Sequence, residues 1–281
     1  MRLKRNIFLC SLLLLLSAQT VLSQGYKVKT IVIDPGHGGD KPGAAGSFSV
    51  EKNVALQVGL KLGKKFEEEM PGVKIIYTRK TDVDVSLYRR AEMANEAKAD
   101  LFIAIHCNSM PDNRVVTGYT KTKRGKRIPK YGYVKNKVTS GTETFVAGSH
   151  RLNEQDGAIR ENADASLEKD YKKNYDGYDP KDPETFIILS LFKNVYRDKS
   201  LKLARLMQDN YTRDNKRQNR GVKEQGILVL QRCGMPAVLT EIGFISNPTE
   251  ESYMNSASGQ SEIVNAIFKA VKTYKKETEV N

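Results

Sequence analysis

Cysteine is scarce in this sequence, which excludes a fold built on disulfide bonds. The 281 residues include three cysteines, of which Cys10 lies in an N-terminal apolar run, so Cys107 and Cys233 remain for the folded domain. Two cysteines are too few for a disulfide-built scaffold, so a hydrophobic core must hold the fold, and we expect two buried free thiols. Tandem repeats, low-complexity linkers and a second long apolar run are also lacking. The chain therefore predicts one domain with a large core.

The N-terminal residues predict a secretory signal peptide over 1–23. Basic Arg2, Lys4 and Arg5 precede a short apolar run, and small residues follow up to Ser23. A charged start, an apolar run and a small-residue exit are typical of a cleaved signal, and the run is short for a membrane span. We expect a periplasmic or secreted protein with a mature domain over 24–281; a retained anchor is the alternative. Cleavage lowers the formal net charge from +13 to about +10.

Hydrophobic periodicity predicts alternating strands and helices. Apolar residues recur every four positions from Val50 to Phe66, which indicates a helix with one buried stripe. The expected strands cover 27–34, 73–78, 100–106, 142–146, 226–230 and 237–240. Further helices are expected over 87–97, from 201 onward and over 263–271. This alternation predicts an α/β fold, a single domain whose twisted, mostly parallel or mixed sheet of about six strands is covered by helices on both faces.

Three hydrophobic runs end in residues that bind metals well. His37, His106 and Glu241 each stand at the end of such a run, and Glu51 opens an amphipathic helix. Ligands of open α/β sheets collect where strands end, so these residues predict one shared site. Two histidines and one carboxylate are a common catalytic zinc set that leaves a fourth position for water. Each residue alone has an ordinary structural explanation, such as a first-turn glutamate, but together they indicate a metal-dependent hydrolase.

Five short motifs follow one another through most of the mature chain. They are Asp34-Pro35-Gly36-His37-Gly38-Gly39, Glu51-Lys52-Asn53, Thr78-Arg79, Ile105-His106-Cys107-Asn108 and Glu241-Ile242-Gly243-Phe244-Ile245-Ser246-Asn247. Their content and order resemble the zinc-dependent N-acetylmuramoyl-L-alanine amidases of the amidase-3 type. The resemblance implies that His37, Glu51 and His106 hold Zn²⁺ and that Glu241 is the catalytic carboxylate.

The same resemblance implies a substrate and a reaction. The substrate would be peptidoglycan, and the bond would be the amide between N-acetylmuramic acid and L-alanine of the stem peptide. Zinc lowers the pKa of bound water from 15.7 to about 7, and the catalytic carboxylate would transfer the proton to the leaving amine. Arg79, Arg90 and Asn95 occupy positions that maintain the fold in this family.

Two other classes of protein fit part of the pattern. A zinc carboxypeptidase acting on wall peptides uses similar ligands but needs a cation for the terminal carboxylate, and Arg79 and Arg90 lie in structural contexts. A non-catalytic wall-binding protein is expected to lack at least one of the four site residues, and all four are present. The sequence therefore favours the amidase.

The segment 114–137 carries nine basic residues and no acidic one, interleaved with tyrosines. Such a composition is typical of nucleic-acid binding, but secretion argues against a nucleic-acid partner. We expect either a solvated loop or a surface that attracts anionic polymers of the cell envelope.

A second segment, 147–195, is far longer than ordinary connections and is expected to be a regulatory insertion. It resembles the insertion with which related amidases cover the zinc cleft until a partner displaces a helix. Glu161, Asp164 and Glu168 are spaced i, i+3 and i+7, which gives one acidic stripe on a helix. We expect Glu161, or else Glu168, to contact zinc as an autoinhibitory ligand, and an activator protein to displace the segment. A substrate-binding flap or a solvated acidic face is the alternative.

Overall fold

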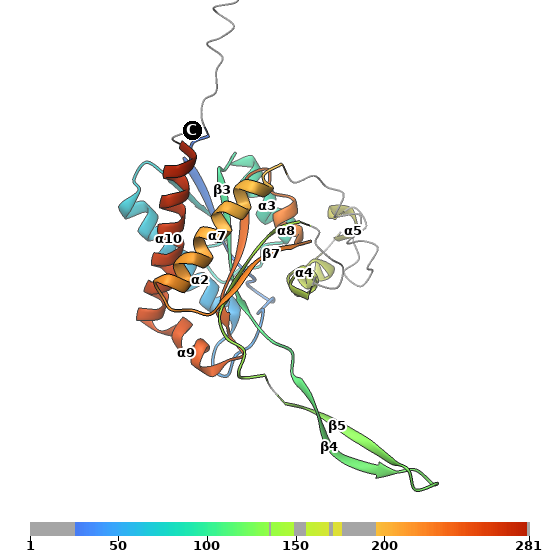
Figure 1. Ribbon diagram of the computed structural model, residues 1–281. Helices are drawn as coiled ribbons and strands as arrows, with labels where there is room; N and C mark the ends of the chain where they lie inside the picture. Colours follow the sequence, from blue (N-terminus) through green and yellow to red (C-terminus); the bar gives the residue numbers. More distant parts are fainter. Residues whose placement is uncertain (1–25, 135, 149–155, 169–170, 176–194, 280–281) are drawn as a thin grey trace, which may run out of the picture.

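A six-stranded mixed sheet forms the centre of the molecule (Figure 1). The computed structural model describes residues 26–134, 136–148, 156–168, 171–175 and 195–279. The strands of this sheet are β1 (Thr30–Pro35), β2 (Lys74–Tyr77), β3 (Leu101–Asn108), β6 (Thr142–Ala147), β7 (Asn219–Gln225) and β8 (Ala237–Phe244). Their order is β2-β1-β3-β8-β6-β7; β6 pairs antiparallel with β8, and the other neighbours pair in parallel. The predicted α/β class with a mixed sheet is confirmed.

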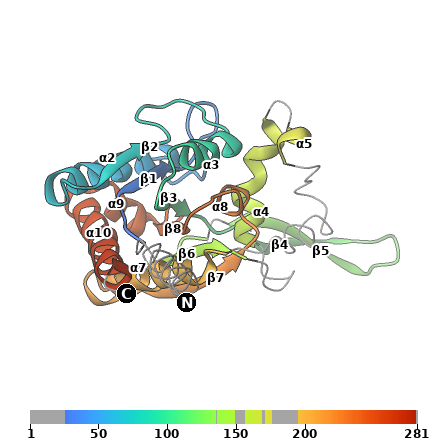
Figure 2. The same ribbon diagram turned by 90° about the horizontal axis from the view of Figure 1, so that it is seen from above.

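Helices cover both faces of the sheet, as predicted (Figures 1 and 2). The longer helices are α2 (Glu51–Glu69), α3 (Leu87–Glu96), α7 (Arg197–Arg213), α9 (Pro248–Asn255) and α10 (Ala257–Glu279). The short ones are α4 (Asp156–Asn162), the 3₁₀ helix η2 (Ala163–Leu167), α5 (Tyr171–Asn174) and α8 (Leu228–Gln231). The helices α2, α7 and α10 share one hydrophobic core with the sheet, whereas α3, α4 and α8 share the core on the opposite face.

The hydrophobic pattern of the sequence explains how helix α2 and the strands β3 and β8, which carry the site, are packed. Val54, Val58, Leu62 and Phe66 are fully buried, which confirms the stripe predicted for α2. Strands β3 and β8 are buried along their whole lengths because they are neighbours in the middle of the sheet and are covered on both faces. Because β3 pairs with β8, the ends of these two strands, each of which carries a predicted site residue, lie side by side.

Several local predictions differ from the structure. Residues 226–230 were predicted to form a strand, but β7 ends at Gln225 and α8 begins at Leu228. The apolar side chains of this run are buried in the helix as they would be in a strand, so the pattern alone does not separate the two. Cys107 and Cys233 are both free, but Cys233 is only partly buried. The predicted signal peptide lies outside the described residues; among the helices that are described, none has the length and apolar character of a membrane span.

The basic segment forms two paired strands rather than a loop. The strands β4 (Asn113–Lys121) and β5 (Arg127–Val134) pair antiparallel in a two-stranded sheet of their own. Figures 1 and 2 show this hairpin extending well away from the central sheet. It begins a few residues after β3, so it grows from the same edge of the sheet that carries His106.

Candidate metal centre and catalytic site

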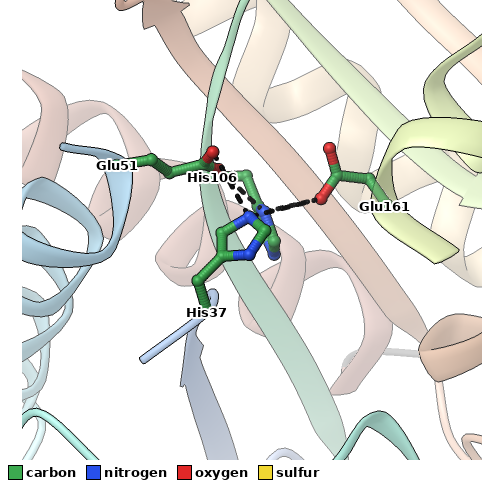
Figure 3. Close-up of side chains that lie close together, drawn as sticks. All are labelled: His37, Glu51, His106 and Glu161. Atoms are coloured by element: carbon green, nitrogen blue, oxygen red, sulfur yellow. Dashed lines mark hydrogen bonds and ion pairs between the residues drawn. The ribbon is translucent and has the colours of Figure 1, made fainter. Parts of the chain in front are cut away.

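His37, Glu51 and His106 lie together at the carboxyl ends of the central parallel strands. His37 follows β1, His106 lies near the end of β3, and Glu51 is the first residue of α2. Figure 3 shows their side chains pointing toward one another, with Glu161 of α4 facing them. One donor atom from each of these four residues lies within 4.8 Å of the other three, and all four residues are buried.

The loop after β1 holds His37 in an uncommon backbone conformation. His37 has a φ of 57°, in the left-handed region that residues other than glycine seldom adopt. Arg79 donates hydrogen bonds to two carbonyl oxygens of this loop at 2.9 and 2.7 Å, and Arg90 donates to the His37 carbonyl at 2.7 Å. Arg90 also forms a buried ion pair with Asp34 at 2.7 Å. The two guanidinium groups thus fix the backbone that carries His37.

Glycine is required where the backbone approaches the imidazole rings. A Cβ atom on Gly36 would lie 2.3 Å from the His106 ring, and one on Gly43 would lie 2.5 Å from the His37 ring. Gly43 also has a φ of +68°, which a side chain would strain. Any larger residue at either position would displace a candidate ligand.

The donor atoms of the cluster face a common point. Glu51 lies 3.2 Å from His37 Nε2 through Oε2 and 3.0 Å from His106 Nδ1 through Oε1. Glu161 Oε2 is 2.8 Å from His106 Nδ1 and 3.9 Å from His37 Nε2. Among the residues that the structure describes, His37 Nε2 and Glu161 Oε2 are nevertheless buried without a hydrogen-bond partner, because these close contacts lack hydrogen-bond geometry. Two nitrogen and two carboxylate donors that lie this close together are a donor set that could hold a metal ion such as zinc.

Opposite charges stabilise one another inside this cluster. Burial by itself lowers the pKa of His37, but the charge of Glu51 and the hydrogen bond with Asp164 outweigh it and raise this pKa to about 9. Burial favours the neutral form of Glu161, yet the charge of His106 outweighs it and lowers the pKa of Glu161 to about 2. Both carboxylates of the cluster are therefore ionised at neutral pH, ready to act as ligands.

Glu241 lies beside the cluster and has one oxygen unengaged. It is fully buried on β8 and is the register partner of His106 on β3. Arg160 Nη2 donates to Glu241 Oε1 at 2.6 Å, whereas Oε2 is buried and has no hydrogen-bond partner in the described part of the chain. Burial raises the pKa of Glu241. The charge of Arg160 lowers this pKa, the charges of Glu161 and Glu51 raise it further, and the resulting pKa is about 8. A carboxylate in this environment is suited to accept and return a proton.

Glu168, the second expected contact, does not join the cluster. Its Oε1 accepts a hydrogen bond from the Leu87 amide at 2.7 Å, and its Oε2 accepts one from the Tyr175 hydroxyl at 2.6 Å. The helix α4 ends at Asn162 and continues as the tighter η2. Glu161 and Glu168 therefore leave the common face that an unbroken α-helix would give them.

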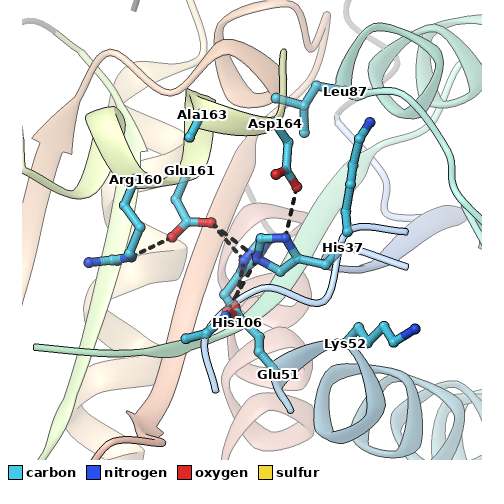
Figure 4. Close-up of polar contacts among 12 residues, drawn as sticks. His37, Glu51, Lys52, Leu87, His106, Arg160, Glu161, Ala163 and Asp164 are labelled. Carbon is cyan, nitrogen blue, oxygen red and sulfur yellow. Dashed lines mark hydrogen bonds and ion pairs between the residues drawn. The ribbon is translucent and has the colours of Figure 1, made fainter. Parts of the chain in front are cut away.

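Two residues of the site were not singled out from the sequence. Asp164, expected only as part of an acidic stripe, has its Oδ2 atom 2.9 Å from His37 Nδ1, so this contact orients the ring with Nε2 toward the cluster (Figure 4). Arg160 bridges Glu161 at 2.8 Å and Glu241 at 2.6 Å. The spacing of the acidic residues hinted at Asp164, but no sequence pattern marks Arg160.

A cleft of about 720 Å³ opens beside the cluster. His37 and Glu51 line one side, and Arg160 and Asp164 of the predicted insertion line another. Residues 109–111, which lead from β3 into the hairpin, also form part of its wall. The cleft thus joins the candidate metal centre, the insertion and the base of the hairpin.

Known proteins share this sequence pattern and this fold. The chain matches the N-acetylmuramoyl-L-alanine amidase family (Amidase_3) over residues 31–273. N-acetylmuramoyl-L-alanine amidase AmiC of Escherichia coli O6:H1 is 25% identical over 245 residues, covering 87% of this chain and 52% of AmiC, so the chain spans about half the length of that relative. The crystal structure of N-acetylmuramoyl-L-alanine amidase from Clostridium difficile 630 is similar, with a TM-score of 0.60 and 24% identity over 89% of this chain and 98% of that chain. The CwlD amidase from Clostridioides difficile, solved in complex with the GerS lipoprotein, has a TM-score of 0.60 and 22% identity over 89% of this chain and 99% of that chain.

The family match extends from β1 into α10 and so includes every predicted site residue. It confirms the predicted resemblance and the predicted class of enzyme, and the structural similarity confirms the fold. The chain belongs to the N-acetylmuramoyl-L-alanine amidase family.

Proposed function

We propose that this protein is a periplasmic or secreted peptidoglycan hydrolase that cleaves the amide bond between N-acetylmuramic acid and L-alanine of the stem peptide, with Zn²⁺ as its cofactor. The observation that carries this proposal is the buried set His37, Glu51 and His106 beside the buried carboxylate Glu241. A hydrolase of an unactivated amide needs an activated water and a proton carrier, and this set contains residues for both.

His37, Glu51 and His106 would hold the zinc ion. Imidazole nitrogens together with a carboxylate suit zinc better than magnesium, which prefers oxygen ligands. The unpartnered Nε2 of His37 supports this assignment, because a buried ring nitrogen without a hydrogen bond is costly unless it binds something. When bound, zinc supplies Lewis acidity at the amide carbonyl and lowers the pKa of a water.

Glu241 would carry the proton from the water to the leaving amine. Its Oε2 atom, which has no hydrogen-bond partner among the described residues, would be the acceptor, and it lies on the fully buried strand β8. Burial raises the pKa of Glu241, which favours acceptance of a proton by this carboxylate. Asp164 of η2 would hold the His37 ring in this orientation while the insertion is in place.

The described arrangement would be a covered, inactive state. Glu161, which contacts His106, would occupy the position that a water needs, and Arg160 engages the Oε1 atom of Glu241. An activator protein would displace α4 and release both groups. The CwlD–GerS complex supports the existence of protein partners for amidases of this fold. Tethering gives Glu161 an effective concentration of order mM, so even a weak contact with the metal would be well occupied.

The contacts of Arg79 and Arg90 weigh against the zinc carboxypeptidase. Arg79 and Arg90 are both buried, and their guanidinium groups donate to backbone carbonyls of the β1 loop. They are not available to bind the terminal carboxylate of a peptide. The presence of Glu241 beside a complete ligand set weighs in the same way against a non-catalytic wall-binding protein.

The central test changes the proton carrier and the ligands separately. Glu241→Gln should abolish amide cleavage and leave zinc content unchanged, whereas His37→Ala and His106→Ala should lose both. Mass spectrometry of digested sacculi would detect the new alanine amine, and metal analysis would count zinc. Glu143→Gln is the matched control, because this buried neighbour of Glu241 on β6 is bonded to Lys223 and Asn108 instead. Near-normal turnover by Glu241→Gln would refute the mechanism.

A further inference from the structure

The projecting hairpin of β4 and β5 has two chemically different faces. β4 contains one extra residue near Thr117, which interrupts the alternation of its side chains. The two sides of the hairpin are therefore assigned from β5, which is regular. Side chains alternate along β5, and each β4 residue shares the side of its partner. One side carries, in register, Arg114 with Tyr133, Val116 with Tyr131, Tyr119 with Pro129, and Lys121 with Arg127. We call this set the tyrosine face.

The rings of the tyrosine face are exposed, and two of the three lie against an arginine. Tyr119, Tyr131 and Tyr133 are 54%, 47% and 70% exposed, respectively. The Arg114 guanidinium lies 3.5 Å from the Tyr131 ring centre, and that of Arg127 lies 4.1 Å from the Tyr119 ring centre. These cation–π contacts orient the Tyr119 and Tyr131 rings before any ligand arrives, which lowers the entropy lost on binding. An exposed and ordered row of rings is a feature of a binding surface rather than of a solvated loop.

The hairpin is basic and connected to the cleft. The segment 114–137 has nine basic residues and no acidic one. Residues 109–111 line the cleft, and β4 begins at Asn113. Strands of this length extend about 25–30 Å at roughly 3.3 Å per residue. A long polymer that enters the cleft can therefore continue along the hairpin.

We propose that the tyrosine face is a second binding surface for peptidoglycan outside the catalytic cleft. This proposal rests on the proposed function, which supplies the polymer. Sugar rings have apolar C–H faces that pack flat on tyrosine rings, and the stem peptides carry carboxylates that complement the lysines and arginines. The surface holds the insoluble polymer near the cleft. It therefore affects how strongly the enzyme binds to the wall and not the rate of the chemical step.

The residue pattern favours this polymer over a lipid bilayer. The turn of the hairpin, from Lys121 to Arg127, contains no apolar residue, so it cannot enter hydrocarbon. The tyrosines instead lie behind the turn, along the strands that lead back to the cleft. Single-stranded nucleic acid would also stack on such a face, but the adjoining cleft belongs to an amidase of the wall.

The test compares the two faces of the same hairpin. Full-length protein carrying Glu241→Gln, so that the polymer stays intact, would be sedimented with insoluble sacculi at low salt. Removal of the rings by Tyr119→Ser, Tyr131→Ser and Tyr133→Ser together should weaken binding about tenfold. The matched control changes three apolar residues of the opposite side, Val115→Ser, Ile128→Ser and Val134→Ser, and should bind like the parent. Circular dichroism of both variants reports whether the domain is folded.

A variant with reversed charges separates long-range electrostatic attraction to the polymer from packing of its sugars on the tyrosine rings. Lys123→Glu, Arg124→Glu and Lys126→Glu together should weaken binding at low salt, and the difference should shrink with added salt because screening acts over about 10 Å at 0.1 M. The loss caused by the tyrosine variant should persist at high salt. With the native Glu241 restored, all hairpin variants should cleave a soluble disaccharide–peptide fragment as the parent does.

The outcomes distinguish this proposal from the proposed function. Failure of the parent to cleave either sacculi or the soluble fragment would refute the amidase, while sedimentation would still report on the hairpin. The hairpin proposal is wrong if the tyrosine variant binds sacculi like the parent, or if the control on the opposite face loses as much. Tyrosine-dependent binding to anionic vesicles or to single-stranded DNA that exceeds binding to sacculi would also overturn it.

Discussion

At the scale of single residues, the proposed closure of the candidate site depends on Glu161. Glu161→Ala should raise the amidase activity of the isolated enzyme, because it vacates the position that a water needs. The same change should weaken zinc binding by at least the roughly 10- to 100-fold that loss of a supporting partner costs. Activity on a soluble fragment and zinc affinity measured by competition with a chelator would check both effects.

Glu168→Ala is the matched comparison. Its carboxylate bonds to the Leu87 amide and the Tyr175 hydroxyl and makes no contact with the cluster, so its removal should leave zinc affinity unchanged. Any gain in activity from Glu168→Ala would then come from a looser attachment of the insertion to α3. If Glu161→Ala instead loses activity while it retains zinc, the insertion grips substrate and does not block the site.

Single residues also show where sequence reasoning works. The convergence of His37, Glu51 and His106 was predictable because parallel strands bring their carboxyl ends to one edge. The role of Arg160 was not predictable, because its partner Glu241 lies far away in the sequence and no periodicity links them. Contacts of this kind depend on how an insertion folds back, which a local pattern does not encode.

At the scale of elements, α9 supports the loop that delivers Glu51. Glu251 of α9 is fully buried and accepts hydrogen bonds from the backbone amides of Ser47, Phe48 and Ser49 at 2.7–2.9 Å. Burial opposes its ionisation, but these hydrogen bonds outweigh it and lower the pKa of Glu251 below its usual 4.5. Glu251→Gln should therefore destabilise the fold at neutral pH by about 1–3 kcal/mol.

The sign of the pH dependence follows from the lowered pKa of Glu251. A carboxyl group whose pKa falls on folding contributes stability above its unfolded pKa, and this stability is lost as the pH falls through the folded value. The difference in melting temperature between parent and Glu251→Gln should be constant above about pH 5 and shrink below 4.5. Glu68→Gln, an exposed carboxylate on α2, is the control and should show no difference. A difference in melting temperature that increases as the pH falls would contradict the stabilising role of the ionised Glu251.

Elements differ in how well the sequence predicts them. The stripe of α2 and the apolar runs of β3 and β8 were predictable because burial on one or both faces imposes a regular pattern. The end of α4 was not, because it depends on the Asn162 side chain, which donates to the Gly226 carbonyl and accepts from the Leu228 amide. The hairpin was not predicted from the sequence, because a run of basic residues is also typical of a solvated loop.

At the scale of the whole molecule, the candidate metal centre ties together segments that are far apart in the sequence. The loop after β1, the start of α2, the end of β3 and the insertion helix α4 each contribute one donor. At the site itself, ion pairs between the two histidines and the carboxylates of α2 and α4 connect these segments. A bound ion would link both hydrophobic cores of the domain, because α2 belongs to one and α4 to the other.

Removal and return of zinc should therefore change global stability. A ligand that binds only the folded state at 100 times its Kd adds about 2.7 kcal/mol, which for a domain of this size corresponds to about 5–10 °C in melting temperature. Chelator-treated protein should melt at a lower temperature and recover when zinc is added. His106→Ala should remain folded but show no zinc-dependent shift, and Glu161→Ala should show a reduced one, because it retains three of the four donors. Differential scanning calorimetry over a range of zinc concentrations would measure the shift, and an undiminished shift in His106→Ala would place the metal elsewhere.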